Sequence, residues 1–343
     1  EEMYGLAGVL DAPHPSASPS ISLKQWMHSN LRLVRLHAEH ARGPCWARSL
    51  ARSLWSGESF YLQVDAHMRF RRCWDTYLLE LHDMCTTLLA NGDSDIETEA
   101  VISTYPPGYD PDGDPPTDIR PTLLVPSHFD DDGILRQKAR QLRFIGGQPL
   151  RHQLWAAGFS FSRSRVMVQD VPYDPMLQDL FFGEEISMAA RLFTRGVACF
   201  APPQTVVYHL WSRAHRPSER HDPDKPGRVS RKLKSQRRVK ALLGMSPEER
   251  TPSGYCESMP MFELGSARSI HEFEKELKVN FSSQTIFDGA DCCGLSPEVF
   301  ADDVGDVLQA IPDRNTLGSQ NSNISPKLQV LSLVQSLMLN PSK

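Results

Sequence analysis

Three features of the 343-residue sequence predict a mixed α/β fold. Strand-like and helix-like stretches alternate between residues 31 and 64, and the strongest helical pattern of the chain follows at 74–89. The composition, with 40% hydrophobic and 23% charged residues, is that of an ordinary globular protein. A chain of this length buries about three quarters of its unfolded surface, so it needs no disulfide staples.

The first half of the chain supplies the alternating pattern. Apolar and polar residues alternate over 31–37 (LRLVRLH), which is typical of a half-buried strand. Apolar residues then recur at every fourth position of 45–55, as on one face of a helix. The apolar run 60–64 (FYLQV) fits a buried strand. Strand, helix and strand in this order favour a parallel βαβ unit.

Later segments continue the pattern. Residues 74–89 place their apolar side chains at helical spacing, and Asn91-Gly92 ends that helix. The further predicted elements are a strand at 100–103, an exposed proline-rich loop at 106–121, a helix at 184–195, a strand at 205–208 (TVVY) and a helical segment at 262–281 that ends in a short strand.

Charge and cysteine content exclude several classes of protein. A net charge of −5 gives no reason to expect binding to nucleic acid or to an anionic membrane. No apolar run is long enough for a membrane-spanning helix. The seven cysteines are odd in number and lack a C-x-x-C pair, which argues against a zinc ribbon and against a secreted disulfide framework. We expect free thiols in a reducing compartment, and thus a cytoplasmic protein.

One basic segment stands out against this charge balance. Residues 213–240 contain eleven Lys or Arg and three Asp or Glu. Such a run is compatible with a nucleic-acid patch or with a solvated, anion-facing segment. It contains no aromatic residue on which a base could stack, so we favour the second interpretation.

The chemistry is concentrated where the strand 60–64 ends. Asp65 and His67 follow it directly, two residues apart, and residues i and i+2 of an extended segment face the same side. Oxygen and imidazole together suit a borderline divalent cation such as Mn²⁺, which can stabilise a diphosphate leaving group. The alternative is a surface turn in which His67 caps a helix.

Two other segments could contribute to the same site. His209 follows the predicted strand 205–208 and is a possible third metal ligand, or else a structural histidine. Glu184 and Glu185 follow Gly183 at a helix start, where they could accept hydrogen bonds from sugar hydroxyls or cap their own helix.

These residues lie in segments that resemble a known family. Residues 41–70 (ARGPCWARSLARSLWSGESFYLQVDAHMRF) look like the donor-site segment of cytoplasmic hydroxyproline N-acetylglucosaminyltransferases, which glycosylate the small adaptor subunit of SCF ubiquitin ligases. The further resembling segments occur in the family's order: STYPPGY (103–109), WAAGFSFS (155–162), VPYDPMLQDLFFGEEISMAARLFTRG (171–196), VVYHLWSR (206–213) and FELGSARSIHEFEKELKVNF (262–281). The chain is also similar to the polypeptide GalNAc-transferases, which have a D-x-H, a Gly-Glu element and a late His in this order.

The resemblance implies a GT-A-like fold, in which helices flank a mixed sheet, and roles for individual residues. Asp65, His67 and His209 would bind Mn²⁺ or another divalent cation, and through it the diphosphate. The other implied roles are Gly158, Glu184 and Glu185 in the donor-sugar pocket, Arg48 near the nucleotide, and Trp155 and Trp211 at the acceptor or in a lid. For both tryptophans a core role is an equal alternative.

The chain also departs from the family. The family begins with an apolar strand and a Ser-Tyr-Arg-Asp-like segment that help to hold the uridine, and nothing before Asp65 matches them. We therefore expect the first strands of the nucleotide-binding half to be lacking. The predicted organisation is an N-terminal loop or linker at 1–30, a glycosyltransferase domain at 31–290 and a partly flexible C-terminal extension at 291–343.

The sequence thus predicts a retaining, Mn²⁺-dependent glycosyltransferase. It would move GlcNAc from the donor UDP-GlcNAc to a hydroxyproline of an acceptor protein, for which the family points to the SCF adaptor, and it would need neither nucleic acid nor a membrane. The alternatives are a glycosyltransferase with a different sugar or acceptor, and a truncated, catalytically inactive binding module.

Overall fold

The computed structural model describes residues 27, 30–92, 96–113, 116–212, 226–245, 259–301 and 336–337. The chain divides into two compact units, Glu1–His40 and Ala41–Lys343. In the first unit, a short helix η1 (Ala38–His40) follows the irregular residues 31–37. The strand predicted at 31–37 is therefore wrong. The leucines of this stretch are about half exposed, and no strand among the described residues pairs with it. The predicted lack of opening strands concerns residues largely outside those described and stays a prediction.

The second unit contains the described helices and strands that matter for the site. Its helices are α2 (Pro44–Ala51), η2 (Arg52–Leu54), α3 (Trp74–Ala90), η3 (Val166–Asp170), α4 (Glu184–Thr194), α5 (Arg228–Leu242), η6 (Pro260–Phe262), α6 (Ile270–Leu277), η7 (Ala290–Cys292) and η8 (Pro297–Val299). Its strands are β1 (Phe60–Val64), β2 (Met68–Phe70), β3 (Glu99–Ser103), β4 (Thr122–Phe129), β5 (Leu135–Gln141), β6 (Leu150–His152), β7 (Phe159–Arg163), β8 (Val197–Ala201), β9 (Val207–His209), β10 (Val279–Asn280), β11 (Thr285–Ile286) and β12 (Ser336–Leu337).

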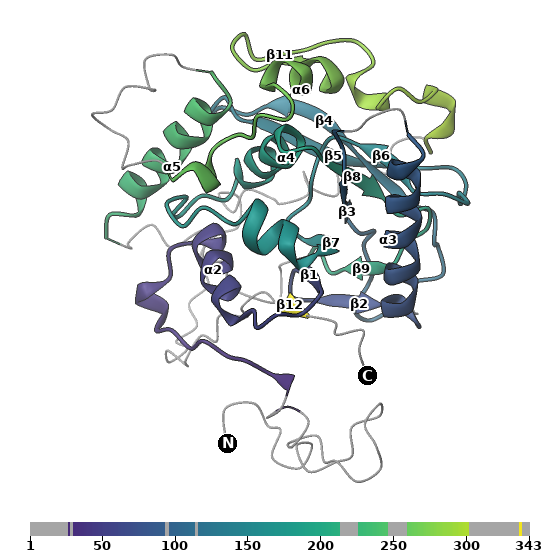
Figure 1. The fold of residues 1–343 in the computed structure, drawn as a ribbon, viewed down its shortest axis with the longest axis horizontal. Helices are drawn as coiled ribbons and strands as arrows, with labels where there is room; N and C mark the ends of the chain where they lie inside the picture. Colours follow the sequence, from purple (N-terminus) through teal and green to yellow (C-terminus); the bar gives the residue numbers. More distant parts are fainter. Residues whose placement is uncertain are drawn as a thin grey trace, which may run out of the picture. The chain divides into compact units, whose positions relative to one another are not determined.

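A six-stranded mixed sheet with the order β12-β1-β7-β3-β8-β6 forms the centre of this unit (Figure 1). β3 and β8 are parallel, and the other neighbouring pairs are antiparallel. The predicted α/β class, a mixed sheet flanked by helices, is confirmed. The predicted parallel βαβ unit is wrong, because β1 pairs antiparallel with both of its neighbours and no strand lies at 31–37.

The four inner strands of the central sheet, β1, β7, β3 and β8, are buried on both faces, and their side chains alternate between two hydrophobic clusters. Leu62, Ile102 and Phe200 point to the cluster under α3, which contributes Leu78 and Leu81. The intervening residues point to the opposite face, where α4 and parts of α5 and α6 cover them: Tyr61, Val101 and Cys199. Strands buried on both sides read as continuous apolar runs, which is why the run 60–64 predicts β1 correctly.

Smaller sheets surround the central one. β4 and β5 form an antiparallel hairpin, and β2 pairs antiparallel with β9. The β2–β9 pair joins the segment that follows β1 to the segment that contains His209.

The segment around α6 is tied to the central sheet through a buried carboxylate. The side chain of Glu97, just before β3, is only 3% exposed and forms ion pairs with Arg151 and Arg268. Arg268 also lies over the ring of Phe193 in α4, 3.6 Å from its centroid. Phe273 of α6 is fully buried in the cluster on the α4 face. The segment at 262–281 is thus part of the core.

Most other predicted elements are confirmed with small shifts of their ends. The helices at 74–89 and 184–195 and the strands at 60–64 and 100–103 are present, and the strand at 205–208 is shortened and shifted to β9. Six described cysteines are free thiols, which agrees with the predicted lack of disulfides. In the described part of the chain, no helix has both the length and the hydropathy to cross a membrane.

Helix α6 begins with a capping box. The Ser269 hydroxyl accepts a hydrogen bond from the backbone N–H of Glu272, and the Glu272 carboxylate accepts one from the backbone N–H of Ser269. We expect Ser269→Ala to lower the free energy of unfolding by about 1 kcal/mol, measured by urea denaturation, because the exposed N-terminal amides lose this acceptor. Ser266→Ala, on the exposed turn before α6, serves as the control. Equal effects of the two changes would contradict the role of the cap.

Candidate functional site

The candidate site lies where β1 ends. Because β1 and β7 are antiparallel, the end of β1 lies beside the start of β7, with Val64 opposite Phe159. The backbone N–H of Asp65 donates to the carbonyl of Gly158 at 3.0 Å. A Cβ at Gly158 would lie 3.1 Å from an oxygen of the Asp65 carboxylate, so the glycine leaves room for this carboxylate. The two predicted residues are thus in contact.

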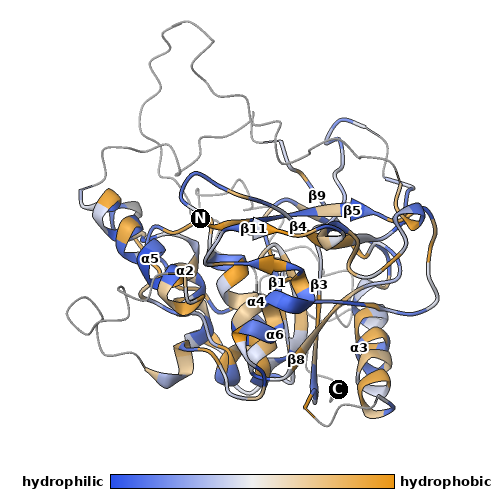
Figure 2. Ribbon diagram, turned by 90° about the horizontal axis from the view of Figure 1, so that it is seen from above, coloured by the Kyte–Doolittle hydropathy of each residue, from blue (hydrophilic) through white to orange (hydrophobic). Residues whose placement is uncertain are grey.

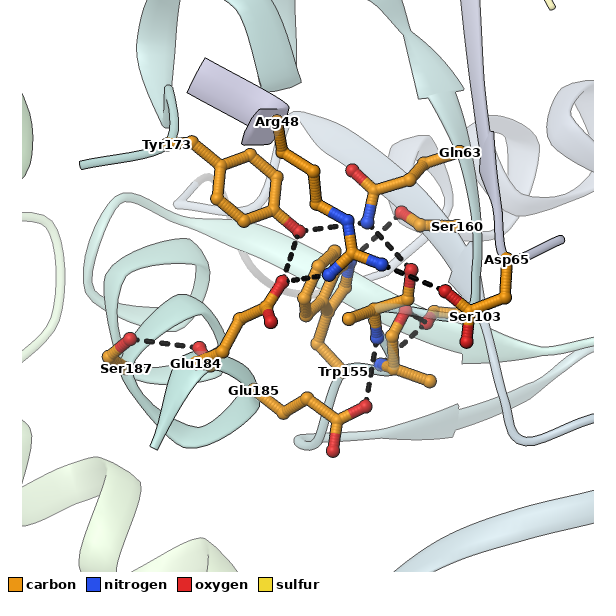
Figure 3. A network of polar contacts seen from close by, with 12 residues as sticks. Arg48, Gln63, Asp65, Ser103, Trp155, Ser160, Tyr173, Glu184, Glu185 and Ser187 are labelled. Carbon is orange, nitrogen blue, oxygen red and sulfur yellow. Dashed lines mark hydrogen bonds and ion pairs between the residues drawn. The ribbon is translucent and has the colours of Figure 1, made fainter. Parts of the chain in front are cut away.

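Arg48 of α2 links this carboxylate to Glu184 (Figure 3). Its guanidinium donates to Asp65 at 2.9 Å and, through another nitrogen, to Glu184. The side chains of Arg48 and Glu184 are each 5% exposed, whereas that of Asp65 is 39% exposed. Burial by itself lowers the pKa of Arg48, but the neighbouring charges, Glu184 first, outweigh it and raise the pKa above its ordinary value. Arg48 is therefore a fixed cation between the two carboxylates.

Two further side chains complete this network. The Tyr173 hydroxyl donates to Glu184 at 2.8 Å and accepts from the amide of Gln63 at 2.8 Å. The same Gln63 amide donates to the carbonyl of Ala157 at 2.7 Å. Gln63 is a fully buried polar residue inside an apolar strand, and these bonds satisfy its donors. The Glu184 carboxylate is thus held directly by Arg48 and Tyr173, and Gln63 in turn binds Tyr173.

Glu185 faces a different set of partners. At the helix start, Gly183 adopts a φ of 109°, a conformation that glycine adopts readily, and the chain turns there into α4. The Glu185 carboxylate accepts hydrogen bonds from the backbone N–H of Ala157 at 2.9 Å and from the hydroxyl of Tyr105. The amide of Gln137 in turn donates to the Tyr105 hydroxyl at 3.2 Å. Both glutamates are thus bound to groups outside their own helix end.

Glu185 is the residue of this site that we expect to respond to pH. Burial raises its pKa from 4.5 to about 7, although the hydrogen bonds from Tyr105 and Ala157 lower it. A carboxyl with a raised pKa binds more protons in the folded state, so its contribution to stability is present at low pH and is lost as the pH rises from about 4.5 to about 7. We expect this pH-dependent loss to be smaller in Glu185→Gln, as measured by urea unfolding across that range. Glu80→Gln, a change on α3, is the control, and identical pH profiles of wild type and Glu185→Gln would contradict the assignment.

The structure brings His67 and His209 together, although not through one sheet edge as the sequence suggested. The extended backbone ends at Val64, and His67 adopts a left-handed φ of 72°, so the same-side argument for residues 65 and 67 does not apply. Instead, β2 pairs with β9 so that Met68 lies opposite His209, and the N–H of Leu210 donates to the carbonyl of His67 at 3.1 Å. In the described ranges, no three His, Cys, Asp or Glu side chains already form a group that could hold a metal. The metal set therefore stays a prediction.

The two candidate tryptophans occupy different environments. Trp155 is fully buried, and its indole N–H donates to the hydroxyl of Ser160 at 2.9 Å, which favours the core role. Trp211 is half-buried, and its ring lies 4.3 Å from that of His209 and 5.8 Å from that of Tyr105, measured between centroids. Trp211 thus lies next to a predicted metal ligand and to the partner of Glu185, and its acceptor or lid role stays a prediction.

Sequence reasoning missed four residues of the network, namely Gln63, Tyr105, Gln137 and Tyr173. Tyr105 and Tyr173 lie inside the segments STYPPGY and VPYDP, so a buried hydroxyl next to Glu184 or Glu185 could have been sought there. Gln63 could have been found as the one polar residue of the run FYLQV. Gln137 lies in β5, where the sequence gives no comparable signal.

This arrangement places charged side chains of both signs at one strand end. Asp65 is partly exposed at a strand end, with a permanent cation behind it and two carboxylates beside it. Carboxylates are acceptors for the hydroxyl groups of a polar ligand.

Comparison with known proteins agrees with this geometry. No curated protein matches the chain significantly. A family model described as glycosyltransferase (GlcNAc) matches residues 11–283, which is most of the chain and includes all of the site residues named above. The chain therefore belongs to the GlcNAc glycosyltransferase family.

Proposed function

We propose that this protein transfers GlcNAc from UDP-GlcNAc to a hydroxyproline of an acceptor protein, with retention at the sugar carbon. The observation that carries the proposal is the convergence of Arg48, Asp65, Glu184 and Glu185 at the end of β1, inside segments that resemble the hydroxyproline-modifying family. Membership of the GlcNAc family supports the sugar, and the resemblance supports the acceptor. The free thiols support the predicted reducing, cytoplasmic compartment.

We propose Asp65, His67 and His209 as the ligands of a divalent cation. One carboxylate and two imidazoles suit Mn²⁺. The backbone pairing of β2 with β9 supports the choice, since it holds the two histidine-bearing segments side by side. When bound, the cation would supply positive charge to the diphosphate leaving group.

The residues of this chain would then position the donor. Arg48 holds the Asp65 carboxylate from behind and fixes Glu184, while Glu185 offers a carboxylate at the turn around Gly158. In a retaining transfer on the leaving-group face, the bond between the sugar carbon and the UDP oxygen breaks. The acceptor oxygen forms the new bond to this carbon, and its proton passes to the departing phosphate oxygen. A preorganised set of charges around this point lowers the barrier without having to rearrange.

A donor and acceptor panel tests the proposal. We expect Mn²⁺-dependent release of UDP with UDP-GlcNAc, faster in the presence of a hydroxyproline peptide than of the matched proline peptide. UDP-GalNAc and UDP-glucose serve as the competing donors. Preference for another sugar would replace the proposed donor, and equal rates with the two peptides would replace the proposed acceptor. Failure to bind UDP with Mn²⁺ in calorimetry would favour a binding module instead.

A further inference from the structure

Helix α5 concentrates positive charge in a chain that is negative as a whole. Its fifteen residues, Arg228–Leu242, include seven Lys or Arg and no Asp or Glu, whereas the whole chain carries a net charge of −5. Like charges on neighbouring turns of a helix repel one another, so this concentration costs stability unless something compensates it. Among the described residues, carboxylates of the segment 174–179 and of the β4–β5 turn compensate part of this charge.

The inner side of α5 is bound to the segment 174–179. Arg231 pairs with Asp179 at 2.5 Å, Arg238 pairs with Asp174, and the hydroxyl of Ser235 donates to a backbone carbonyl of the same segment at 2.7 Å. The carboxylates of Asp174 and Asp179 are 4% and 1% exposed, so these two arginines are used within the fold.

The outer side of α5 has a different character. Val229, Leu233 and Arg237 follow one another at a spacing of four residues and therefore lie along one stripe, with Lys234 beside it. Val229 is 68% exposed and Leu233 is 47% exposed, and the two cations are exposed as well. Within the described part of the chain, neither Lys234 nor Arg237 has a carboxylate partner. Figure 2 shows hydrophobic and hydrophilic residues interspersed along this helix.

Helix α5 is joined to the candidate site through its inner side. Asp174, which binds Arg238, directly follows Tyr173, the residue that donates to Glu184. The start of α5 also contacts the β4–β5 turn, where Lys232 pairs with Asp132 at 3.2 Å. A partner on the outer face would therefore be held on a helix that is itself anchored to the segment beside Tyr173.

We propose that the outer face of α5, defined by Val229, Leu233, Lys234 and Arg237, binds an acidic protein segment that carries an apolar residue. The cations provide charge complementarity, and the two exposed aliphatic side chains provide a contact that only a partner with its own apolar side chain would bury. A nucleic acid is disfavoured because the helix offers no aromatic ring for stacking. A membrane surface is disfavoured because the stripe has only two aliphatic residues and no aromatic anchor.

The inference deepens the proposed function. It rests on that function for one point, namely that the acidic segment belongs to the acceptor protein. Docking there would bring the acceptor to the site without any contact to the reacting atoms. It would raise affinity for the protein acceptor and leave the use of the donor unchanged.

Binding can be measured without any catalysis. The probe is a fluorescent peptide of glutamates with one leucine, and its matched control has glutamine in place of every glutamate. We expect the full chain to bind the acidic probe in fluorescence anisotropy, more weakly as salt increases. Lys234→Glu with Arg237→Glu should weaken binding about tenfold or more, and Leu233→Ser should weaken it severalfold. The control variant, Arg72→Glu with Lys275→Glu, changes the net charge equally on exposed positions of other elements.

Each outcome decides the proposal. Equal weakening by both double variants, or equal binding of the glutamate and glutamine probes, would overturn it. Tighter binding of a single-stranded RNA or of phosphatidylserine vesicles than of the acidic probe, with loss in the α5 variant, would assign the face to that ligand instead.

A second assay separates this inference from the proposed function. Hydrolysis of UDP-GlcNAc without acceptor should be the same in wild type and the α5 variant, so its absence in both would contradict the proposed function alone.

Discussion

Replacement of Arg48 by alanine is expected to lower the free energy of unfolding by about 3–5 kcal/mol, because it leaves Glu184 as a buried carboxylate without its cation. The Tyr173 hydroxyl remains as a donor to Glu184, but it carries no compensating charge. We expect UDP-GlcNAc turnover to fall by about 10²–10³-fold in the same variant, because Asp65 also loses the group that orients it. Urea denaturation and UDP release measure the two effects.

Two companion variants make this expectation specific. Arg52→Ala removes a partly exposed arginine from the adjoining turn η2 and should have little effect on either measurement. Arg48→Lys keeps the charge but not the two-pronged geometry that reaches both carboxylates, so it should recover part of the stability and little of the turnover. Full stability in Arg48→Ala would show that the pairing with Glu184 does not hold in solution.

Replacement of Asp65 by alanine should change stability little and reduce UDP release strongly. The Asp65 side chain is 39% exposed, and Arg48 keeps Glu184 as a partner, so the loss of stability should stay below about 1 kcal/mol. Mn²⁺-dependent UDP release should nevertheless fall on the order of 100-fold or more, since the proposed cation loses its carboxylate ligand. Calorimetric titration of Mn²⁺ and UDP should show weaker binding.

Asp83→Ala, on the exposed side of α3, is the control for the loss of an aspartate. His209→Ala extends the test, because the proposed site predicts that it affects UDP binding in the same direction as Asp65→Ala. If both variants release UDP at the wild-type rate, the metal assignment is wrong.

The sequence predicts an element correctly where the residues of that element alone determine its structure. The run FYLQV predicts β1 because a strand buried on both faces needs apolar residues at every position but one, and Gln63 has its own hydrogen-bond partners. The assignment of Gly158 to the same site as Asp65, in contrast, comes from the resemblance and not from any pattern in the residues, and their contact is seen only in the fold. The alternating stretch at 31–37 failed because alternation describes a face and does not supply the neighbour that buries it.

Contacts between residues far apart in the chain cannot be predicted from the periodicity of apolar residues. β1 pairs with β7 across almost a hundred residues, and nothing local to either strand specifies an antiparallel partner. Likewise, the bond between Tyr105 and Glu185 joins a proline-rich turn to a helix start. Glu184 and Glu185 were predicted together as sugar ligands, yet only the fold shows that one is enclosed by Arg48 and Tyr173 while the other faces Ala157 and Tyr105.

The buried carboxylate before β3 bears on the order in which the chain can fold during synthesis. The buried Glu97 carboxylate pairs with Arg268, which is synthesised about 170 residues later. The apolar surface of α4 that Phe273 covers also stays exposed until then. A nascent chain that ends before Arg268 would expose this apolar face and keep a carboxylate inside with only one of its two cations. The core on the α4 face therefore cannot be completed until the α6 segment has emerged. Pulse proteolysis of stalled chains should show protection appearing only after the α6 segment leaves the ribosome.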